Sequence, residues 1–265
     1  MIRSDSSRTW FVTVENNNNL SIFHLEKDYN QDDESIYDMK KGNTIFTKKK
    51  IIDVACFPIF LEGSFLVLYD DNSIRMFYQK NGDHSEIEIG FKDIPPKLKT
   101  IKLFHYSSDV YVGLMSENMF SLFGFQSFPN FEVFPIRNIQ KRNCLDFDFG
   151  KNPSIWLATK ESLLLYRILE TIPIFESKPK AGPILSFSAN SIADRCCYTT
   201  KNKTITIIYS KSSAYSETVL NSPNDLDNSI ISWKVFGNAF TIKINDTELD
   251  YNEIEPDKWE IKETL

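Results

Sequence analysis

A short alternation of apolar residues, ending on a large side chain, recurs five times along the chain. Each copy follows a turn made of Asn, Asp, Glu or Lys residues, and the copies recur at intervals of 42 to 54 residues. Their limits are 20–23, 74–77, 120–123, 163–166 and 205–208. A period of two residues is the pattern of a β-strand with one buried face, and helical periodicity is missing over any useful length. The chain is therefore expected to consist of repeated short strands.

Each copy is one strand of a predicted unit of four, which we label a to d in chain order. Strands b and c form a hairpin, and the hairpins are expected near 10–25, 65–78, 110–125, 155–168, 196–209 and 240–251. Strand a is expected at 51–57, 100–106, 144–149, 183–188 and 230–236. Strand d is expected at 35–39, 86–91, 131–136, 172–176, 217–220 and 259–261.

Four short strands in a period of about forty to forty-five residues are typical of a β-propeller. The sequence thus predicts an all-β protein, a β-propeller of about six four-stranded blades in a single domain spanning 1–265. Two stacked β-sandwiches are the alternative. The first unit has no recognisable strand a before Trp10, so its completion stays open. Either the C-terminal strand returns to complete the first sheet, or the ring is open and a partner closes it, or the chain is part of a longer protein. Unpaired strand edges have to be covered in each case.

The inner strands and the c strands resemble those of the WD40-repeat family. Residues 145–149 and 231–235 read apolar-polar-apolar-x-apolar, as the inner strand of that family does, and residues 71–77 resemble the stretch before its Trp-Asp pair. The Gly-His dipeptide of the family does not occur. Its Trp position is held by Phe23, Phe77, Phe123, Tyr166 and Ile208. The resemblance implies a divergent WD40-like propeller, a fold that serves as a platform for binding partners.

Composition supports a folded chain and narrows the expected compartment. Of the 265 residues, 42% are hydrophobic and 14% are aromatic, which is ample for a buried core. No signal peptide and no apolar stretch of about eighteen residues is visible, so no transmembrane segment is expected. Cys56, Cys144, Cys196 and Cys197 have neither zinc spacing nor a Cys-x-x-Cys pattern. We expect four reduced, buried thiols in an intracellular protein of the eukaryotic nucleus or cytoplasm.

Candidate catalytic residues are few. His24, His84 and His105 have no second His or Cys at ligand spacing, so no metal site is expected. Asp146 and Asp148 share one face of a predicted strand a, where two carboxylates could shift each other's pKa or bind a cation. The alternative is that Asp146 fills the polar position of strand a and bonds to nearby backbone. We favour this alternative, and expect no enzyme, no cofactor and no small-molecule substrate.

Charge is distributed unevenly between the predicted connections. The net charge of −6 argues against nucleic-acid binding by the whole surface. In a propeller, however, the d–a and b–c connections share one rim, and the a–b and c–d connections share the other. We call the d–a side the basic rim. Its predicted partner-binding residues are Lys48, Lys49, Lys50, Lys97, Lys99, Arg137, Lys141, Arg142, Lys178 and Lys180, and Lys40, Lys41 and Lys92 fall in the same connections.

Acidic residues interrupt the basic rim once and gather opposite it. The fifth d–a connection, 221–228, carries Asp225 and Asp227 in place of cations. The opposite rim is expected to hold Glu26, Asp28, Asp32, Asp33, Glu34, Glu253, Glu255 and Asp257. Surface lysines often serve only solubility. A positive field focused on one rim would instead attract an anionic partner, namely an acidic protein segment, a nucleic acid or a phosphoinositide headgroup.

These patterns predict a non-enzymatic scaffold subunit of a multi-subunit complex, which binds protein subunits through the basic rim. The alternative is an accessory subunit that holds RNA or DNA for a catalytic partner. Aromatic residues in the d–a connections are few, Phe46 and Phe91, which disfavours stacking of single-stranded bases. A third, enzymatic alternative would place an active centre at Asp146 and Asp148.

Overall fold

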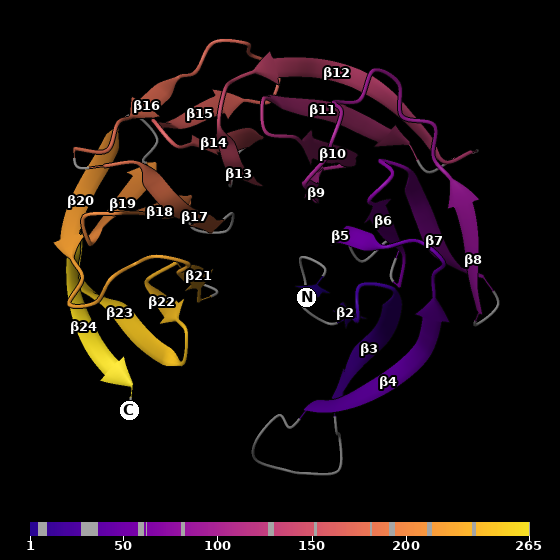
Figure 1. Ribbon diagram of the computed structural model, residues 1–265, viewed down its shortest axis with the longest axis horizontal. Coiled ribbons are helices and arrows are strands. Elements are labelled where there is room, and N and C mark those ends of the chain that lie inside the picture. The colour runs from indigo at the N-terminus through magenta and orange to yellow at the C-terminus, as the bar shows by residue number, and fades with distance from the viewer. Residues whose placement is uncertain are drawn as a thin grey trace. The chain divides into compact units, whose positions relative to one another are not determined.

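A computed structural model shows six four-stranded antiparallel sheets and no α-helix in the residues that it describes. The described residues are 1–4, 10–27, 37–57, 61, 63–80, 83–126, 130–150, 153–180, 182–190, 194–210, 214–234 and 237–264. The chain divides into two compact units, Met1–Asn138 and Ile139–Leu265. Figure 1 shows the strands of each unit, coloured from indigo at the N-terminus to yellow at the C-terminus.

The first unit contains three sheets, in each of which four strands follow one another in chain order. Within the unit, β5 lies beside both β1 and β9, so neighbouring sheets meet through their first strands. The strands are β1 (Ile2–Ser4), β2 (Trp10–Glu15), β3 (Asn19–Lys27), β4 (Tyr37–Phe46), β5 (Ile51–Cys56), β6 (Phe65–Tyr69), β7 (Ile74–Lys80), β8 (Asp83–Glu88), β9 (Thr100–Tyr106), β10 (Asp109–Met115), β11 (Met119–Gln126) and β12 (Glu132–Gln140).

The second unit repeats this plan in three further sheets, with β17 lying beside both β13 and β21. Its strands are β13 (Cys144–Phe149), β14 (Ser154–Thr159), β15 (Leu163–Arg167), β16 (Phe175–Ser177), β17 (Ile184–Asn190), β18 (Arg195–Thr200), β19 (Thr204–Ser210), β20 (Tyr215–Asn221), β21 (Ile230–Trp233), β22 (Ala239–Ile244), β23 (Thr247–Glu255) and β24 (Lys258–Thr264).

Inner and outer strands differ in how well the apolar pattern predicts their ends. β9 and β13 have the predicted limits, whereas β4 covers 37–46 instead of 35–39 and β16 shrinks to 175–177. Strand d is the outer strand of each sheet. It pairs on one side only and is largely exposed, so few apolar residues mark its ends. For the same reason His84, which precedes the predicted strand 86–91, lies in the outer strand β8, where its Nε2 is 2.9 Å from the carbonyl oxygen of Gly63.

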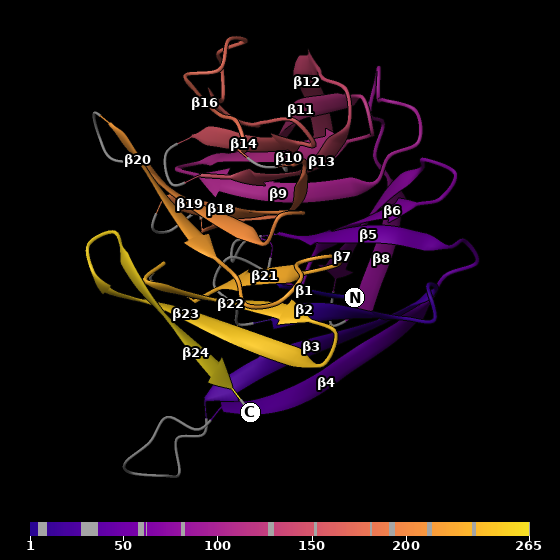
Figure 2. The same ribbon diagram turned by 60° about the vertical axis from the view of Figure 1, so that its left-hand side comes forward.

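The first sheet has a first strand that the sequence did not reveal. Ile2–Ser4 pair antiparallel with β2, and the Met1 ammonium donates a hydrogen bond of 3.1 Å to the carbonyl oxygen of Val14. The C-terminal strand β24 pairs with β23 in the last sheet (Figure 2). Completion of the first sheet by the C-terminal strand is therefore wrong. Three exposed residues carry too little alternation for β1 to be recognised.

Strands b and c supply most of the buried core. All residues of β6 and of β14 are buried. The large residue near the end of strand c is also buried in four sheets, at Phe77, Phe123, Tyr166 and Ile208. Phe23 is the exception, because it is only half-buried and stacks on its cross-strand partner Phe11 with ring centroids 5.2 Å apart.

A buried carboxylate joins three strands of the first unit. Asp53 in β5 is 2% exposed, and its Oδ1 accepts a hydrogen bond of 3.0 Å from Nε of Arg3 in β1. Its Oδ2 accepts a hydrogen bond of 3.2 Å from the backbone N–H of Ile101 in β9. The polar position of strand a thus links neighbouring sheets, and buried polar atoms with such partners stabilise one arrangement over others.

We expect the replacement Arg3→Ala to destabilise the chain in a pH-dependent way. Burial raises the pKa of Asp53 and the Arg3 guanidinium opposes this rise, so the folded variant holds a proton on Asp53 more readily than the wild type does. The free energy of unfolding should fall by about 1–3 kcal/mol near pH 7. This deficit should shrink as the pH falls toward the unfolded-state pKa of about 3.9, because a protonated Asp53 needs no cation. Urea unfolding at both ends of this pH range measures it, and a deficit independent of pH would contradict the prediction.

A shielded ion pair holds the last strands of the second unit. Arg195 in β18 pairs with Glu253 in β23, and the two side chains are only 14% and 11% exposed. The Arg195 guanidinium carbon lies 4.4 Å from the ring centroid of Tyr209 and 5.9 Å from that of Trp259 in β24. A single cation therefore contacts three strands and two aromatic faces, a favourable setting for a charge shielded from water.

Candidate binding surface

Hydrogen bonds join the d–a connections to the b–c turns within each unit. In the first unit, the N–H of Thr47 donates to the carbonyl oxygen of Asn18, and that of Leu98 donates to Oδ1 of Asn72, both at 2.9 Å. In the second unit, the N–H of Lys160 donates to the carbonyl oxygen of Asn143 at 3.0 Å. The two kinds of connection therefore share one rim in each unit, as the strand order requires.

The connection from β8 to β9 presents three exposed lysines. Lys92, Lys97 and Lys99 are exposed, whereas Leu98 between the last two is buried in the core of the first unit. The buried Leu98 and its hydrogen bond to Asn72 hold this segment in place, and Lys97 adopts a positive φ of 55°. Because the side chain of Leu98 points into the core, the side chains of its neighbours Lys97 and Lys99 point to solvent.

The connection from β4 to β5 holds three lysines with different surroundings. Lys48 and Lys50 are exposed. The ammonium of Lys49 lies 2.5 Å from Oδ2 of Asp71 and donates to Oγ of Ser73 at 3.1 Å. The hydrogen bond from Lys49, together with those from the hydroxyl and the N–H of Ser73, holds the pKa of the Asp71 carboxyl well below its usual range. Lys49 is thus engaged by the neighbouring turn, and Lys48 and Lys50 are the two cations that this connection offers to a partner.

In the second unit, exposed cations occur in two of the d–a connections. Lys141 and Arg142 precede β13, and Lys178 and Lys180 precede β17; all four are exposed. Lys178 lies 3.8 Å from Oε1 of Glu176, a distance at which an exposed pair contributes little. The connection before β21 differs, because its Asp225 pairs with Lys203 of a b–c turn at 3.2 Å.

Three of the cations assigned to connections lie in strands instead. Lys40 and Lys41 belong to β4, and Arg137 belongs to β12. The three guanidinium nitrogens of Arg137 are shielded from solvent, so this residue offers no charge to a partner. Both outer strands extend further than their weak apolar patterns indicate. Of the acidic residues expected opposite, Asp28, Asp32, Asp33 and Glu34 lie outside the described residues.

Asp146 and Asp148 each accept a hydrogen bond from the backbone of the following residue. Oδ1 of Asp146 accepts a hydrogen bond of 2.8 Å from the N–H of Phe147, and Oδ1 of Asp148 accepts one of 3.1 Å from Phe149. Both carboxylates therefore bond to adjacent backbone, as the alternative interpretation expects. In the described part of the chain, no group of three or more His, Cys, Asp or Glu side chains could hold a metal ion.

The cysteines belong to the buried core. All four are in the described part of the chain, buried and outside any disulfide. Burial raises the pKa of the Cys196 and Cys197 thiols well above their ordinary value, so neither forms a thiolate near neutral pH. In the described part of the chain, no helix has the length and the apolar character needed to span a membrane.

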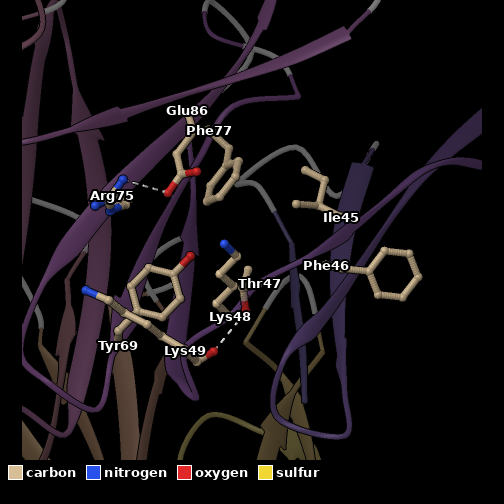
Figure 3. Close-up of a pocket in the computed structure, with 9 residues that line it drawn as sticks. All are labelled: Ile45, Phe46, Thr47, Lys48, Lys49, Tyr69, Arg75, Phe77 and Glu86. Carbon is tan, nitrogen blue, oxygen red and sulfur yellow. Dashed lines mark hydrogen bonds and ion pairs between the residues drawn. The ribbon is translucent and has the colours of Figure 1, made fainter.

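A pocket of about 350 Å³ opens between the end of β4 and the strands β6, β7 and β8 (Figure 3). Tyr69 and Phe77, which are 3% and 4% exposed, form its apolar wall. Arg75 and Glu86, paired at 3.1 Å, border it. Phe46 is 74% exposed at its edge, and Figure 3 shows the ring pointing away from the other side chains. Sequence reasoning missed this pocket because its residues come from four strands and one connection.

Comparison with known proteins decides the fold. Neither a family model nor a curated protein matches this sequence. Among solved structures, the chain is similar to the crystal structure of the β-propeller domain of Cps50 (Swd1) from Myceliophteria thermophila, with a TM-score of 0.66 and 10% identity. The similarity covers 95% of this chain and 82% of that chain. The fold is a β-propeller.

The predicted fold class is thereby confirmed, and the six sheets are its blades. At 10% identity the similarity concerns the fold alone and carries no function from one protein to the other.

Proposed function

We propose that this propeller is a single WD40-like domain and a non-enzymatic scaffold subunit of a multi-subunit complex. It binds an acidic protein partner through the basic rim, inside the cell, in the nucleus or the cytoplasm. The four buried thiols outside any disulfide support a reducing compartment.

The observation that carries the proposal is the set of exposed cations on anchored connections. In the first unit these are Lys48, Lys50, Lys92, Lys97 and Lys99; in the second unit they are Lys141, Arg142, Lys178 and Lys180. Hydrogen bonds to the b–c turns hold the connections before β5, β9 and β13, so little entropy is lost there when a partner binds. Clustered charges of one sign raise the rate of encounter with an oppositely charged partner.

Charge reversal tests the proposal in each unit separately. We expect Lys97→Glu with Lys99→Glu, and Lys141→Glu with Arg142→Glu, each to lower recovery of the native partner by about tenfold or more, because electrostatic steering is lost. The tagged chain is purified from its own cells, and the co-purifying proteins are identified and quantified. Thermal unfolding should change little, because exposed charges contribute only about 0–1 kcal/mol to stability.

Arg167→Glu with Lys234→Glu is the matched control. These exposed residues lie near a c–d and an a–b connection of the second unit, at the other ends of the sheets, and the double variant changes the charge by the same amount. The proposal fails if this control loses the partner while the rim variants retain it.

The same purification tests the nucleic-acid alternative. A protein interface survives nuclease treatment, and its affinity responds moderately to salt. If the partner is RNA or DNA, recovery is lost on nuclease treatment and the logarithm of the affinity falls linearly with the logarithm of the salt concentration.

A further inference from the structure

The pocket beside β4 contains two hydrogen-bond donors that the protein itself does not use. Lys49 is bound to Asp71 and Ser73, and Arg75 is bound to Glu86, with Glu88 at 3.7 Å. No hydrogen bond or ion pair joins the Lys48 ammonium or the Tyr69 hydroxyl to a described residue, and both line the pocket. Figure 3 shows the Lys48 amine and the Tyr69 hydroxyl directed into the space beside Glu86.

The Tyr69 hydroxyl keeps its proton at physiological pH. Burial, together with the nearby carboxylate of Glu86, raises the pKa of Tyr69 to about 12. It therefore remains a donor beside the cation of Lys48. One O–H and one ammonium facing the same space suit the two oxygens of a carboxylate.

The surrounding charges favour a monoanion over a phosphate group. Glu86 lines the pocket, Glu88 lies 3.7 Å from Arg75, and Asp71 is paired with Lys49. Lys48 is thus the one lining cation without a carboxylate partner among the described residues. A dianion would meet the repulsion of these carboxylates, whereas a single negative charge matches the single uncompensated cation.

The apolar surface of the pocket requires an apolar group next to that carboxylate. Phe77 forms part of the wall, and Ile45 lines the side nearest to β4. Phe46, at 74% exposed, is an unusually accessible aromatic side chain at the edge. Covering this edge with a large apolar side chain removes apolar surface from water, which favours binding. Aromatic rings are frequent anchors in protein interfaces.

We infer that this pocket binds a partner-protein segment in which an Asp or Glu side chain stands next to an aromatic one. The carboxylate accepts hydrogen bonds from Lys48 and Tyr69, and the aromatic ring extends out of the pocket and packs against the exposed ring of Phe46 at its edge. This inference rests on the proposed function, since it states the chemistry of the partner at one end of the basic rim.

Peptide titration tests the inference with the full chain. The probe is an acetylated, amidated hexapeptide Ser-Gly-Asp-Phe-Gly-Ser, added to isotope-labelled protein and followed by the backbone amide signals of residues 45–49. We expect saturable shifts with a Kd on the order of 0.1–1 mM, the range of a short flexible ligand. Replacing Asp by Asn, or Phe by Ala, in the peptide should weaken binding at least fivefold. Tighter binding of a phosphoserine peptide, or no shift with the Asp-Phe peptide, would overturn the inference.

Protein variants separate the pocket from the general charge of the rim. Lys48→Glu and Phe46→Ser should each weaken peptide binding at least fivefold, and Tyr69→Phe should weaken it about threefold, the loss of one hydrogen bond. Lys50→Glu is the matched control, because it makes the same charge change two residues away on an exposed residue that does not line the pocket. Equal losses with Lys48→Glu and Lys50→Glu would overturn the inference in favour of diffuse attraction.

The inference and the proposed function can fail independently. If the Lys48 and Phe46 variants bind the peptide normally while Lys97→Glu with Lys99→Glu still loses the native partner, the pocket is wrong and the basic rim stands. If the peptide binds as expected but the rim variants retain the partner, the pocket stands and the role of the rim is wrong.

Discussion

Removal of Asp257 to Leu265 is expected to unfold the second unit or make it aggregate. The deletion takes away β24, which pairs with β23 over residues 258–264. It also removes Trp259, whose ring centroid lies 5.3 Å from that of Phe240 and 6.3 Å from that of Trp233. Loss of a fully buried Trp costs about 3–5 kcal/mol, and the partly buried Trp259 contributes a share of this. A whole strand adds to this, and the sum approaches the total stability of a typical domain, about 5–15 kcal/mol.

Circular dichroism during heating and light scattering after gel filtration measure the effect of this deletion. A shorter deletion, Lys262 to Leu265, is the control, because it leaves Trp259 and the start of β24 in place. The full deletion also exposes the edge of β23, and an uncovered strand edge promotes association between chains. A truncated chain that stays monomeric with an unchanged melting transition would show that β24 has no structural role.

Asp53→Ala is expected to lower the free energy of unfolding by about 1–3 kcal/mol for the buried N–H of Ile101, which loses its acceptor, and by a smaller amount for the pair with Arg3, whose side chain is 42% exposed. The variant leaves the Arg3 guanidinium without its carboxylate and the N–H of Ile101 without its acceptor. Asp53→Asn should lose less, because the amide oxygen still accepts the backbone hydrogen bond. Denaturation by urea gives the comparison from the transition midpoints.

Asp71→Ala is the matched control for Asp53→Ala. Asp71 also pairs with a cation, Lys49, but its side chain is 47% exposed, so its loss should cost no more than about 1 kcal/mol. Equal losses at the two positions would contradict the role assigned to Asp53, since the prediction depends on the difference in burial.

Local sequence patterns determined most of the strands and turns. Alternation along residues 144–149 predicts β13 with its observed limits, because one face of an inner strand is buried and the other is not. Asn-rich turns were located for a similar reason. Asn16, Asn17, Asn72 and Asn245 all adopt positive φ, and asparagine tolerates this conformation better than most residues.

Patterns were weakest where a strand is short or lies at the edge of a sheet. β1 has three exposed residues, so its pairing with β2 leaves no periodic trace in the sequence. Arg137 was assigned to a connection because β12 extends beyond its apolar stretch. Backbone pairing with a neighbouring strand therefore forms β1 and lengthens β12 where the side-chain pattern gives no sign of a strand.

By itself, the sequence determined that the chain forms repeated four-stranded sheets and that cations gather in the d–a connections, because alternation and turn chemistry are properties of neighbouring residues. The tertiary structure decided which of those cations are available. Lys49 is neutralised by Asp71 from the adjacent turn and Arg137 is shielded, whereas Lys48 faces a pocket built from β4, β6, β7 and β8. Such differences arise from contacts between residues far apart in the chain, where Coulomb attraction and burial depend on distance in space and not on distance along the sequence.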